Sequence, residues 1–217
     1  MKPPRWSETL LRLLLVDRDR DTISGDLLEE YREGVVPTRG AKGARWWYRR
    51  QVAGFLWHSA RLPLMIGLTL GTILGIMNLV DTARQPLADD DGGTMLAWLL
   101  AVLTMWSAAS VAVTWRTRRV GDAVKVGTIV GVATIVVLHT AAIVRVNLFL
   151  DAIRHRGDWQ NLVARYNQSG FQSLRVYANY EYVTMTPLLI ALGTIAGSIS
   201  GALGGLVNMV RRAVRAD

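Results

Sequence analysis

Few side chains in this sequence could carry out a reaction. The chain has no cysteine, which excludes a thiol nucleophile, a disulfide and a zinc–thiolate site. The three histidines, His58, His139 and His155, lie in three different topological regions, and no carboxylate occurs within the long apolar segments. Neither a metal site nor a carboxylate proton relay is therefore indicated.

His139 is the ionisable side chain that lies deepest in an apolar segment, IVVLHTAAIV. A neutral histidine at this depth is expected to hydrogen-bond across a helix bundle, most simply to Ser198 or Ser200. A serine hydrolase would use Ser200 as nucleophile and His139 as base, but the chain reads SISG where rhomboid-type proteases have glycine-x-serine-glycine. No oxyanion hole is recognisable either. We therefore expect no catalytic residue, no cofactor and no enzymatic activity.

Four apolar segments determine the fold class, and they lie near residues 62–80, 94–115, 126–144 and 183–210. The first, LPLMIGLTLGTILGIMNLV, has neither a charge nor a polar stripe. At helical rise it spans roughly 28 Å, about the thickness of the hydrocarbon core of a bilayer. We expect an all-α membrane protein in which domain 62–217 is a four-helix transmembrane bundle.

The distribution of positive charge predicts the orientation in the membrane. The net charge of +8 does not by itself indicate nucleic-acid binding, because in a membrane protein the placement of Lys and Arg matters more than their sum. Of these residues, 19 lie in the segment before the first span, in the turn between the second and third spans and in the C-terminal tail. The other two loops carry 6. Both termini are therefore expected on the cytoplasmic side of a bacterial inner membrane. The start of the chain does not read as a signal peptide.

The first 61 residues are expected to form a cytoplasmic helical module. Ser7 is the predicted N-cap of a first helix, a second helix in GDLLEEYRE is expected to stop at Gly34, and VPTRGAKG is expected to be a linker. An interfacial helix then precedes the first span, with rings at headgroup depth and arginines near anionic lipid. Its lipid-facing candidates are Arg45, Trp46, Trp47, Tyr48, Arg49 and Arg50.

Two motifs in this region, GDLLEEY at Gly25–Tyr31 and RWWYRRQV at Arg45–Val52, resemble the permease prefix domain in order and separation. That module precedes macrolide-export-type ABC permeases in some bacteria. The resemblance covers roughly Arg5 to Trp57 and implies a transport-associated neighbourhood. The chain departs from such permeases because only DTARQPLADDDGG separates its first two spans, and it lacks the phosphate-binding loop of an ATPase.

The acidic side of this module has three interpretations. Asp26, Glu29, Glu30 and Glu33 could pair with the positive RWWYRR segment, present a docking face to another protein, or form a solvated helix face. The apolar residues of the same helix are expected to pack on the preceding helix. The docking candidates are Asp26, Leu27, Leu28, Glu29, Glu30 and Tyr31.

The expected outer loop 145–182 is the one sizeable region on its side of the membrane. DWQNLVARYNQSG predicts a short helix with Asp158 as N-cap and Gly170 as the stop. The loop is also rich in tyrosine, which indicates either a ligand or partner surface or rings that lie at the membrane interface.

Glycines recur every four residues in the first and last spans, with a shorter pair in the third at Gly127 and Gly131. Such spacing makes a groove along one helix face, which lets two backbones approach in lipid. It predicts close packing of spans one and four, with homo-oligomerisation or a glycine-lined pore as alternatives. The helix-packing candidates are Gly67, Gly71, Gly75, Gly193, Gly197, Gly201 and Gly205.

These patterns predict a non-enzymatic membrane protein that acts as an accessory or regulatory subunit of an ABC-type transporter or another membrane protein. One alternative is a signalling protein that senses through loop 145–182. Another is a small self-assembling transporter or channel. The bilayer itself is an expected partner, and nucleic acid is not.

Overall fold

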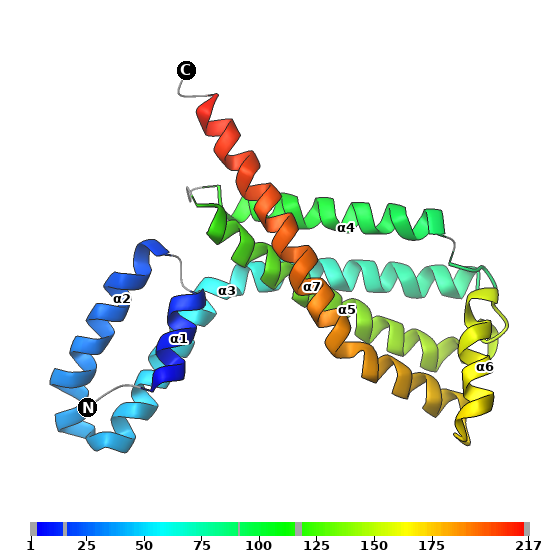
Figure 1. Cartoon of the computed structure of the whole chain (residues 1–217), viewed down its shortest axis with the longest axis horizontal. Helices are drawn as coiled ribbons and strands as arrows, with labels where there is room; N and C mark the ends of the chain where they lie inside the picture. Colours follow the sequence, from blue (N-terminus) through cyan, green and yellow to red (C-terminus); the bar gives the residue numbers. More distant parts are fainter. Residues whose placement is uncertain (1–3, 15–16, 91, 116–118, 215–217) are drawn as a thin grey trace. The chain divides into compact units, whose positions relative to one another are not determined.

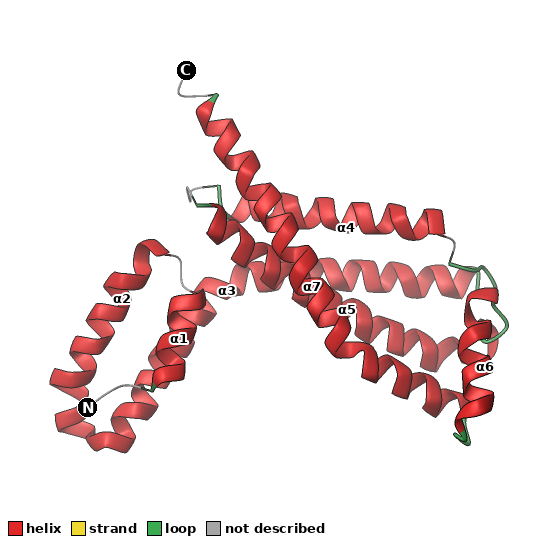
Figure 2. Ribbon diagram, viewed as in Figure 1, coloured by secondary structure: helices red, strands yellow, loops and turns green. Residues whose placement is uncertain are grey.

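The computed structural model describes residues 4–14, 17–90, 92–115 and 119–214, which are almost entirely helical and contain no strand (Figure 1, Figure 2). The all-α fold class is therefore confirmed. The chain divides into two compact units, Met1–Leu62 and Pro63–Asp217. The elements are α1 Arg5–Leu14, α2 Asp17–Glu30, η1 Tyr31–Val35, α3 Val36–Arg84, α4 Gly92–Val113, α5 Val120–Ile153, η2 Gly157–Trp159, α6 Gln160–Ser169 and α7 Leu174–Ala213.

The N-terminal unit is built from α1, α2, the π-helical turn η1 and the first part of α3. Leu27, Tyr31 and Val35 recur every four residues and therefore share one helix face, which is buried. That face packs in one core with Leu11 of α1 and a set of residues from α3. The α3 residues of this core are Ala44, Trp47, Tyr48 and Val52.

The chain reverses direction in this unit at Gly40 rather than in a loop. Gly40 has φ 63° and ψ 176°, a conformation that a residue with a Cβ rarely adopts. The expected stop at Gly34 and the expected linker VPTRGAKG are therefore wrong, because the chain is helical on both sides of this one residue. Concentrating the break at one glycine lets the flanking backbone keep its helical hydrogen bonds.

Ser7 does not start the first helix. The helix α1 begins at Arg5, and the backbone N–H of Ser7 donates to Pro4 O at 3.1 Å. Ser7 is buried, and its hydroxyl has no hydrogen-bond partner among the described residues. The expected N-cap is therefore wrong, and Pro4 supplies the first acceptor instead.

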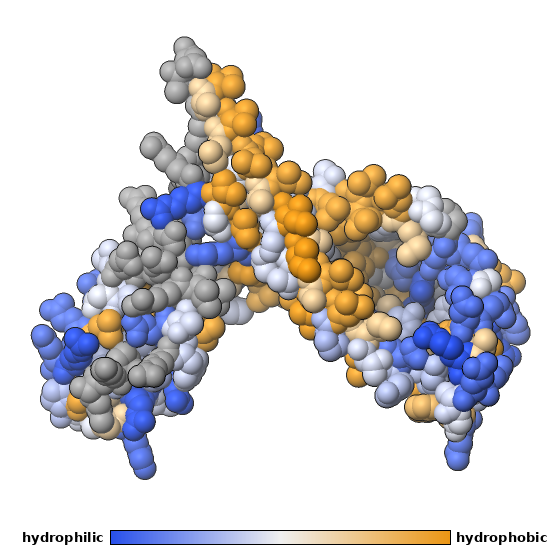
Figure 3. All heavy atoms as spheres, in the orientation of Figure 1, coloured by the Kyte–Doolittle hydropathy of each residue, from blue (hydrophilic) through white to orange (hydrophobic). Residues whose placement is uncertain are grey.

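Among the described residues of the second unit, four helices are long and apolar enough to cross a membrane, in keeping with a multi-pass membrane protein. They are α4, α5, α7 and the part of α3 that belongs to this unit. Their shared core contains Leu74, Val102, Trp106 and Val130. Apolar side chains cover the outside of α7 and α4, whereas hydrophilic ones gather around α6 (Figure 3). A charged end and an apolar flank are the arrangement that a bilayer requires.

The expected loop 145–182 is mostly helical. Helix α5 continues to Ile153 and α7 already begins at Leu174, so that the connection between them contains only η2, α6 and short turns. Trp159 is buried against both helices in a small core of its own, formed by Val146, Leu150, Ile153, Trp159 and Ala178. Gly170 ends α6 with φ 74°, as predicted. Asp158 is not the N-cap of α6, because Trp159 holds that position and makes no side-chain cap.

Glycines bring α5 into contact with both α3 and α7. A Cβ placed on Gly67 would lie 2.7 Å from Ala133 Cβ, and one on Gly131 would lie 2.6 Å from Gly193 O. The glycine faces of α3 and α7 are thus each covered by α5, and the expected packing of span one on span four is replaced by packing of both on span three. Gly204, which the sequence analysis did not single out, meets α4 at Ser107 and Ser110.

Candidate functional site

The predicted docking face, which lies on α2 and η1, separates into an exposed part and a buried part. Leu27 is 4% exposed and Tyr31 is fully buried, because both belong to the core of the unit. These two residues therefore cannot meet a partner, and their inclusion in the docking face was wrong. Leu28 is half-buried. The exposed part is an acidic stripe, a name we use for Asp26, Glu29, Glu30 and Glu33.

Within the described part of the unit, the acidic stripe is not neutralised. None of its four carboxylates forms an ion pair with Arg45, Arg49 or Arg50 among the described side chains. The interpretation in which the stripe pairs with the RWWYRR segment is therefore wrong. The reason is geometric: α2 and α3 share a core, so their polar faces point away from it and from each other.

The predicted lipid-facing segment of α3 is also divided by burial. Trp47 is 8% exposed and Tyr48 is fully buried, with the Tyr48 ring edge-on to Tyr31 at 5.5 Å between centroids. Neither ring is available to lipid, which corrects the expectation for both. The remaining candidates, Arg45, Trp46, Arg49 and Arg50, are exposed.

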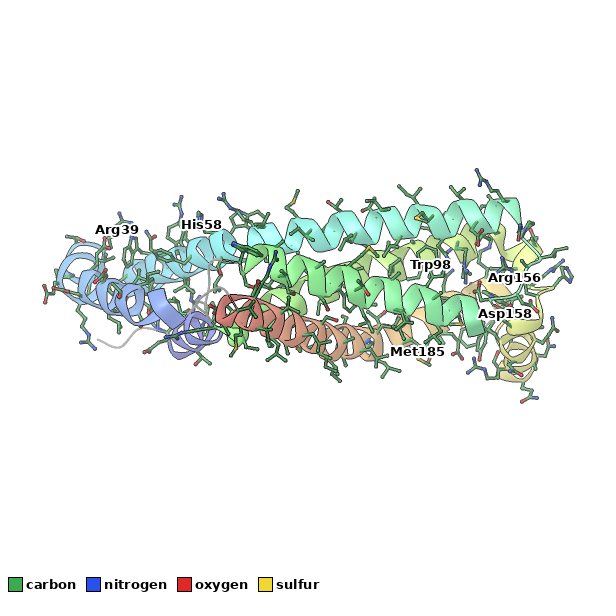
Figure 4. The ribbon with its side chains drawn as sticks, turned by 90° about the horizontal axis from the view of Figure 1, so that it is seen from above. Arg39, His58, Trp98, Arg156, Asp158 and Met185 are labelled. Carbon is green, nitrogen blue, oxygen red and sulfur yellow. The ribbon has the colours of Figure 1, made fainter. Side chains whose placement is uncertain are left out.

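A charged cluster lies at the end of the second unit where α6 is found. Arg145 of α5 is 8% exposed, and its Nη1 lies 3.4 Å from Asp90 Oδ2. Arg156 is buried as well; its Nη1 lies 3.8 Å from Asp90 Oδ1, and its Nε donates to Pro86 O at 2.8 Å. We call this group the α6-end cluster, and Figure 4 labels two of its members. Its members are Asp89, Asp90, Arg145, Arg156 and Asp158.

The acids of this cluster bind backbone as well as side chains. The N–H of Gly157 donates to Asp89 Oδ1 at 2.7 Å, which ties the α3–α4 connection to the turn after α5. Burial, followed by the negative charge of Asp90, raises the pKa of Asp158 above its ordinary value of 3.8. Arg156 opposes this rise without cancelling it. The cluster thus contains a carboxyl that holds a proton more tightly than a free aspartate does.

His139 bonds to a different hydroxyl from those expected. Its Nε2 lies 3.0 Å from Thr186 Oγ1, and its ring stacks on Tyr182. Ser198 shares a hydrogen bond with Thr128 instead. The expected serine partners lie at least three turns, or about 18 Å, further along α7 than Thr186, so His139 does not reach them. A Ser200–His139 pair is excluded for the same reason.

Polar contacts continue along the seam between α5 and α7. Asn147 and Asn179 exchange side-chain amide hydrogen bonds at 2.9 and 3.1 Å, beyond His139 on the way to α6. The tyrosines of the expected loop 145–182 also have structural contacts: the hydroxyl of Tyr177 in α7 donates to Glu181, which pairs with Arg165 at 3.5 Å. Tyr180, by contrast, is 53% exposed.

Sequence reasoning missed the α6-end cluster. One signal was available, because Arg145 ends an apolar segment and DDD at 89–91 stands in a loop expected on the same side of the membrane. The pairing needed the tertiary structure, since 55 residues separate Arg145 from Asp90. Within the described residues, no three His, Cys, Asp or Glu side chains are arranged to hold a metal ion.

Comparison with known proteins finds no matching family, no similar curated protein and no similar solved structure. The function must therefore be inferred from the acidic stripe, the exposed basic segment of α3 and the α6-end cluster.

Proposed function

We propose that this protein is a non-enzymatic accessory or regulatory subunit of a membrane transporter, and that the acidic stripe of its N-terminal unit binds a basic surface of the partner. The observation that carries the proposal is the stripe itself, which is exposed and has no ion pair within the described part of the unit. The resemblance of GDLLEEY and RWWYRRQV to the permease prefix domain supports the choice of a transporter as partner.

The physical argument concerns like charge. Asp26, Glu29, Glu30 and Glu33 follow the i, i+3, i+4, i+7 spacing of one helix face, so neighbouring carboxylates repel one another. A partner with Lys or Arg at matching positions relieves this repulsion, accelerates association and selects against acidic surfaces. The apolar residues next to the stripe, Leu27, Tyr31 and Val35, are buried in the core of the unit, so recognition by the stripe depends on charge.

The proposal includes a topology. We place both termini in the cytoplasm of a bacterial inner membrane, because Lys and Arg are concentrated in the segments that flank the four helices on one side. The acidic stripe then faces the compartment where ATPases and cytoplasmic loops of transporters are found. Access of a membrane-impermeant thiol reagent to Glu29→Cys in intact cells and in inverted vesicles tests this placement.

The test of the proposed function is purification from native membranes through a C-terminal tag, followed by mass analysis of the intact assembly. The quadruple variant Asp26→Asn, Glu29→Gln, Glu30→Gln and Glu33→Gln is expected to lose a co-purifying transporter subunit at least tenfold. A control variant with Asp81→Asn and Asp151→Asn changes exposed acids of the second unit and is expected to retain it. A wild-type protein that purifies alone, or a quadruple variant that retains its partner, overturns the proposal.

The α6-end cluster supports a second candidate, a membrane sensor. The pKa of Asp158 is raised, and it depends on the charges of Asp90, Arg156, Asp89 and Arg145, so protonation of Asp158 would change the electrostatic balance where the α3–α4 connection meets the turn after α5. Replacement of the connection 154–173 would then abolish a response while partner binding survives. The third hypothesis, self-assembly through Gly193–Gly205, gains no support, because α5 of the same chain covers that face.

A further inference from the structure

Three tryptophans of the N-terminal unit are exposed. Trp6 of α1 is 51% exposed, and Trp46 and Trp57 of α3 are 59% and 61% exposed. Exposed indole rings are informative, since a water-facing surface seldom presents several large rings together. Indole is enriched where an apolar ring and a polar N–H both find a suitable environment, which is the headgroup layer of a bilayer.

The same surface is strongly basic. On α3, Lys42, Trp46, Arg49, Arg50 and Trp57 recur at intervals of three, four and seven residues, so they lie on one side of the helix, opposite the core. We call this surface, with its neighbours, the basic–tryptophan face. It consists of Trp6, Lys42, Arg45, Trp46, Arg49, Arg50, Trp57 and Arg61.

No carboxylate of α3 offsets this charge, because no acidic residue occurs from Gly34 to Val80. Two guanidinium groups lie over the tryptophan rings: Arg49 is 5.3 Å from the ring of Trp6, and Arg50 is 5.6 Å from the ring of Trp46. These contacts hold charge and ring together on the surface. Figure 4 shows this part of α3 between the labelled Arg39 and His58.

We propose that the basic–tryptophan face binds the headgroups of anionic phospholipids. Phosphate groups offer the negative charge that the arginines lack among the described residues of the unit, and the carbonyl and glycerol region suits the indole rings. Lipid is favoured over an acidic protein as the binding partner, because the face is covalently connected to the membrane-spanning unit. Only six residues separate Trp57 from Pro63, where the membrane-spanning unit begins, so even extended chain keeps them within about 22 Å.

This proposal is independent of the acidic stripe. It concerns α1 and α3, whereas the proposed transporter contact uses α2 and η1, and the two can fail separately. If both hold, binding of lipid by one face leaves the other face free for the partner, because the two faces point away from a shared core.

The absence of cysteine makes a single-label experiment direct. Ala53→Cys introduces a thiol at an exposed position of the basic–tryptophan face, and Glu29→Cys introduces one on the acidic stripe. The full chain, labelled with an environment-sensitive fluorophore, is placed in nanodiscs of phosphatidylcholine alone or with phosphatidylglycerol. Headgroup spin-labelled lipid serves as the quencher. Strong quenching at position 53 is expected only with phosphatidylglycerol and is expected to fall in high salt, while position 29 stays unquenched.

The variant Arg45→Gln/Arg49→Gln/Arg50→Gln tests the charge in the Ala53→Cys background. Each arginine near an anionic surface strengthens association by about fivefold. Replacing all three is therefore expected to weaken association roughly a hundredfold and to reduce quenching to the level seen in phosphatidylcholine alone. The matched control Glu29→Gln/Glu30→Gln/Glu33→Gln is expected to leave quenching unchanged. Circular dichroism and the single variant Arg50→Gln, expected to weaken association about fivefold, separate loss of charge from loss of fold.

Equal quenching at position 53 in both lipid mixtures overturns the proposal, as does a triple arginine variant that is quenched like its parent. No quenching in either mixture overturns it too, and an acidic protein that then crosslinks to position 53 identifies the occupant instead. Quenching at position 29 equal to that at position 53 also contradicts it, because the response would not be specific to this face.

Discussion

Arg145 and Asp90 meet at the α6 end of the second unit, with Nη1 and Oδ2 3.4 Å apart, although 55 residues separate them in the chain. The guanidinium side chain is 9% exposed and the carboxylate 44% exposed. The pair therefore compensates a buried charge with a partly solvated one. Leaving the buried guanidinium unpaired costs more free energy than leaving the partly solvated carboxylate unpaired.

Asp90→Asn is expected to destabilise the second unit because it leaves the buried guanidinium of Arg145 without its counter-charge. Because Asp90 is half-exposed, the expected loss of unfolding free energy lies between the values for surface and for buried ion pairs, at about 1–2 kcal/mol. Thermal unfolding in detergent micelles measures the change. Asp151→Asn, an exposed acid at the end of α5, is the control and is expected to shift stability by less than about 0.5 kcal/mol. Equal stability of the two variants would contradict this account of the pair.

Asp158→Asn is expected to stabilise the protein at neutral pH. The pKa of Asp158 is raised in the folded state, so the folded chain holds the proton more tightly than the unfolded chain does. As pH rises from 3.8 through the raised pKa, the unfolded chain ionises first and stability falls. Asparagine has no such dependence, so the advantage of the variant appears above that window and disappears below pH 3.8. Unfolding measured across this pH range tests the sign, and a variant that is less stable at pH 7 refutes it.

Gly131→Ala is expected to destabilise the α5–α7 contact. The added Cβ would lie 2.6 Å from Gly193 O and 3.0 Å from Gly197 Cα, and backbone atoms cannot move aside as a flexible side chain can. Overpacking of this kind costs about 1–3 kcal/mol. Gly121→Ala in the same helix is the matched control, because nothing lies within 4 Å of its added methyl group. It is expected to be neutral or to stabilise by up to about 1 kcal/mol through helix propensity. Melting temperatures that rank the two variants in the opposite order would exclude this packing.

Tyr31→Phe is expected to leave the N-terminal unit as stable as the wild type, or slightly more stable. The ring of Tyr31 is fully buried against Tyr48, while its hydroxyl has no hydrogen-bond partner among the described residues. Removing an unsatisfied hydroxyl relieves a desolvation cost, whereas Tyr31→Ala removes the ring and is expected to cost about 3–5 kcal/mol. Limited proteolysis of the full chain ranks the three proteins. A clear loss of protection in the phenylalanine variant would mean that the hydroxyl is bonded.

The sequence alone determined the membrane character of this protein and its helical fold. Uninterrupted apolar runs of bilayer length allow only helices that satisfy their own backbone, so the four spans follow from composition and length. The stop of α6 at Gly170 was also predicted from the local sequence, because glycine adopts the positive φ that ends a helix without a steric cost.

The sequence could not determine which face of each helix meets which neighbour. The motifs RWWYRRQV and GDLLEEY were both visible in the sequence. Only the fold decided that Trp47 and Tyr48 turn inward while Trp46 turns outward. Adjacent residues on a helix differ by about 100° in direction, so the position of the core selects among them. Glycine spacing likewise identified faces that pack closely without naming α5 as their common partner. The Arg145–Asp90 pair depended most on the tertiary structure, because its two residues become neighbours only when the helices between them have assembled.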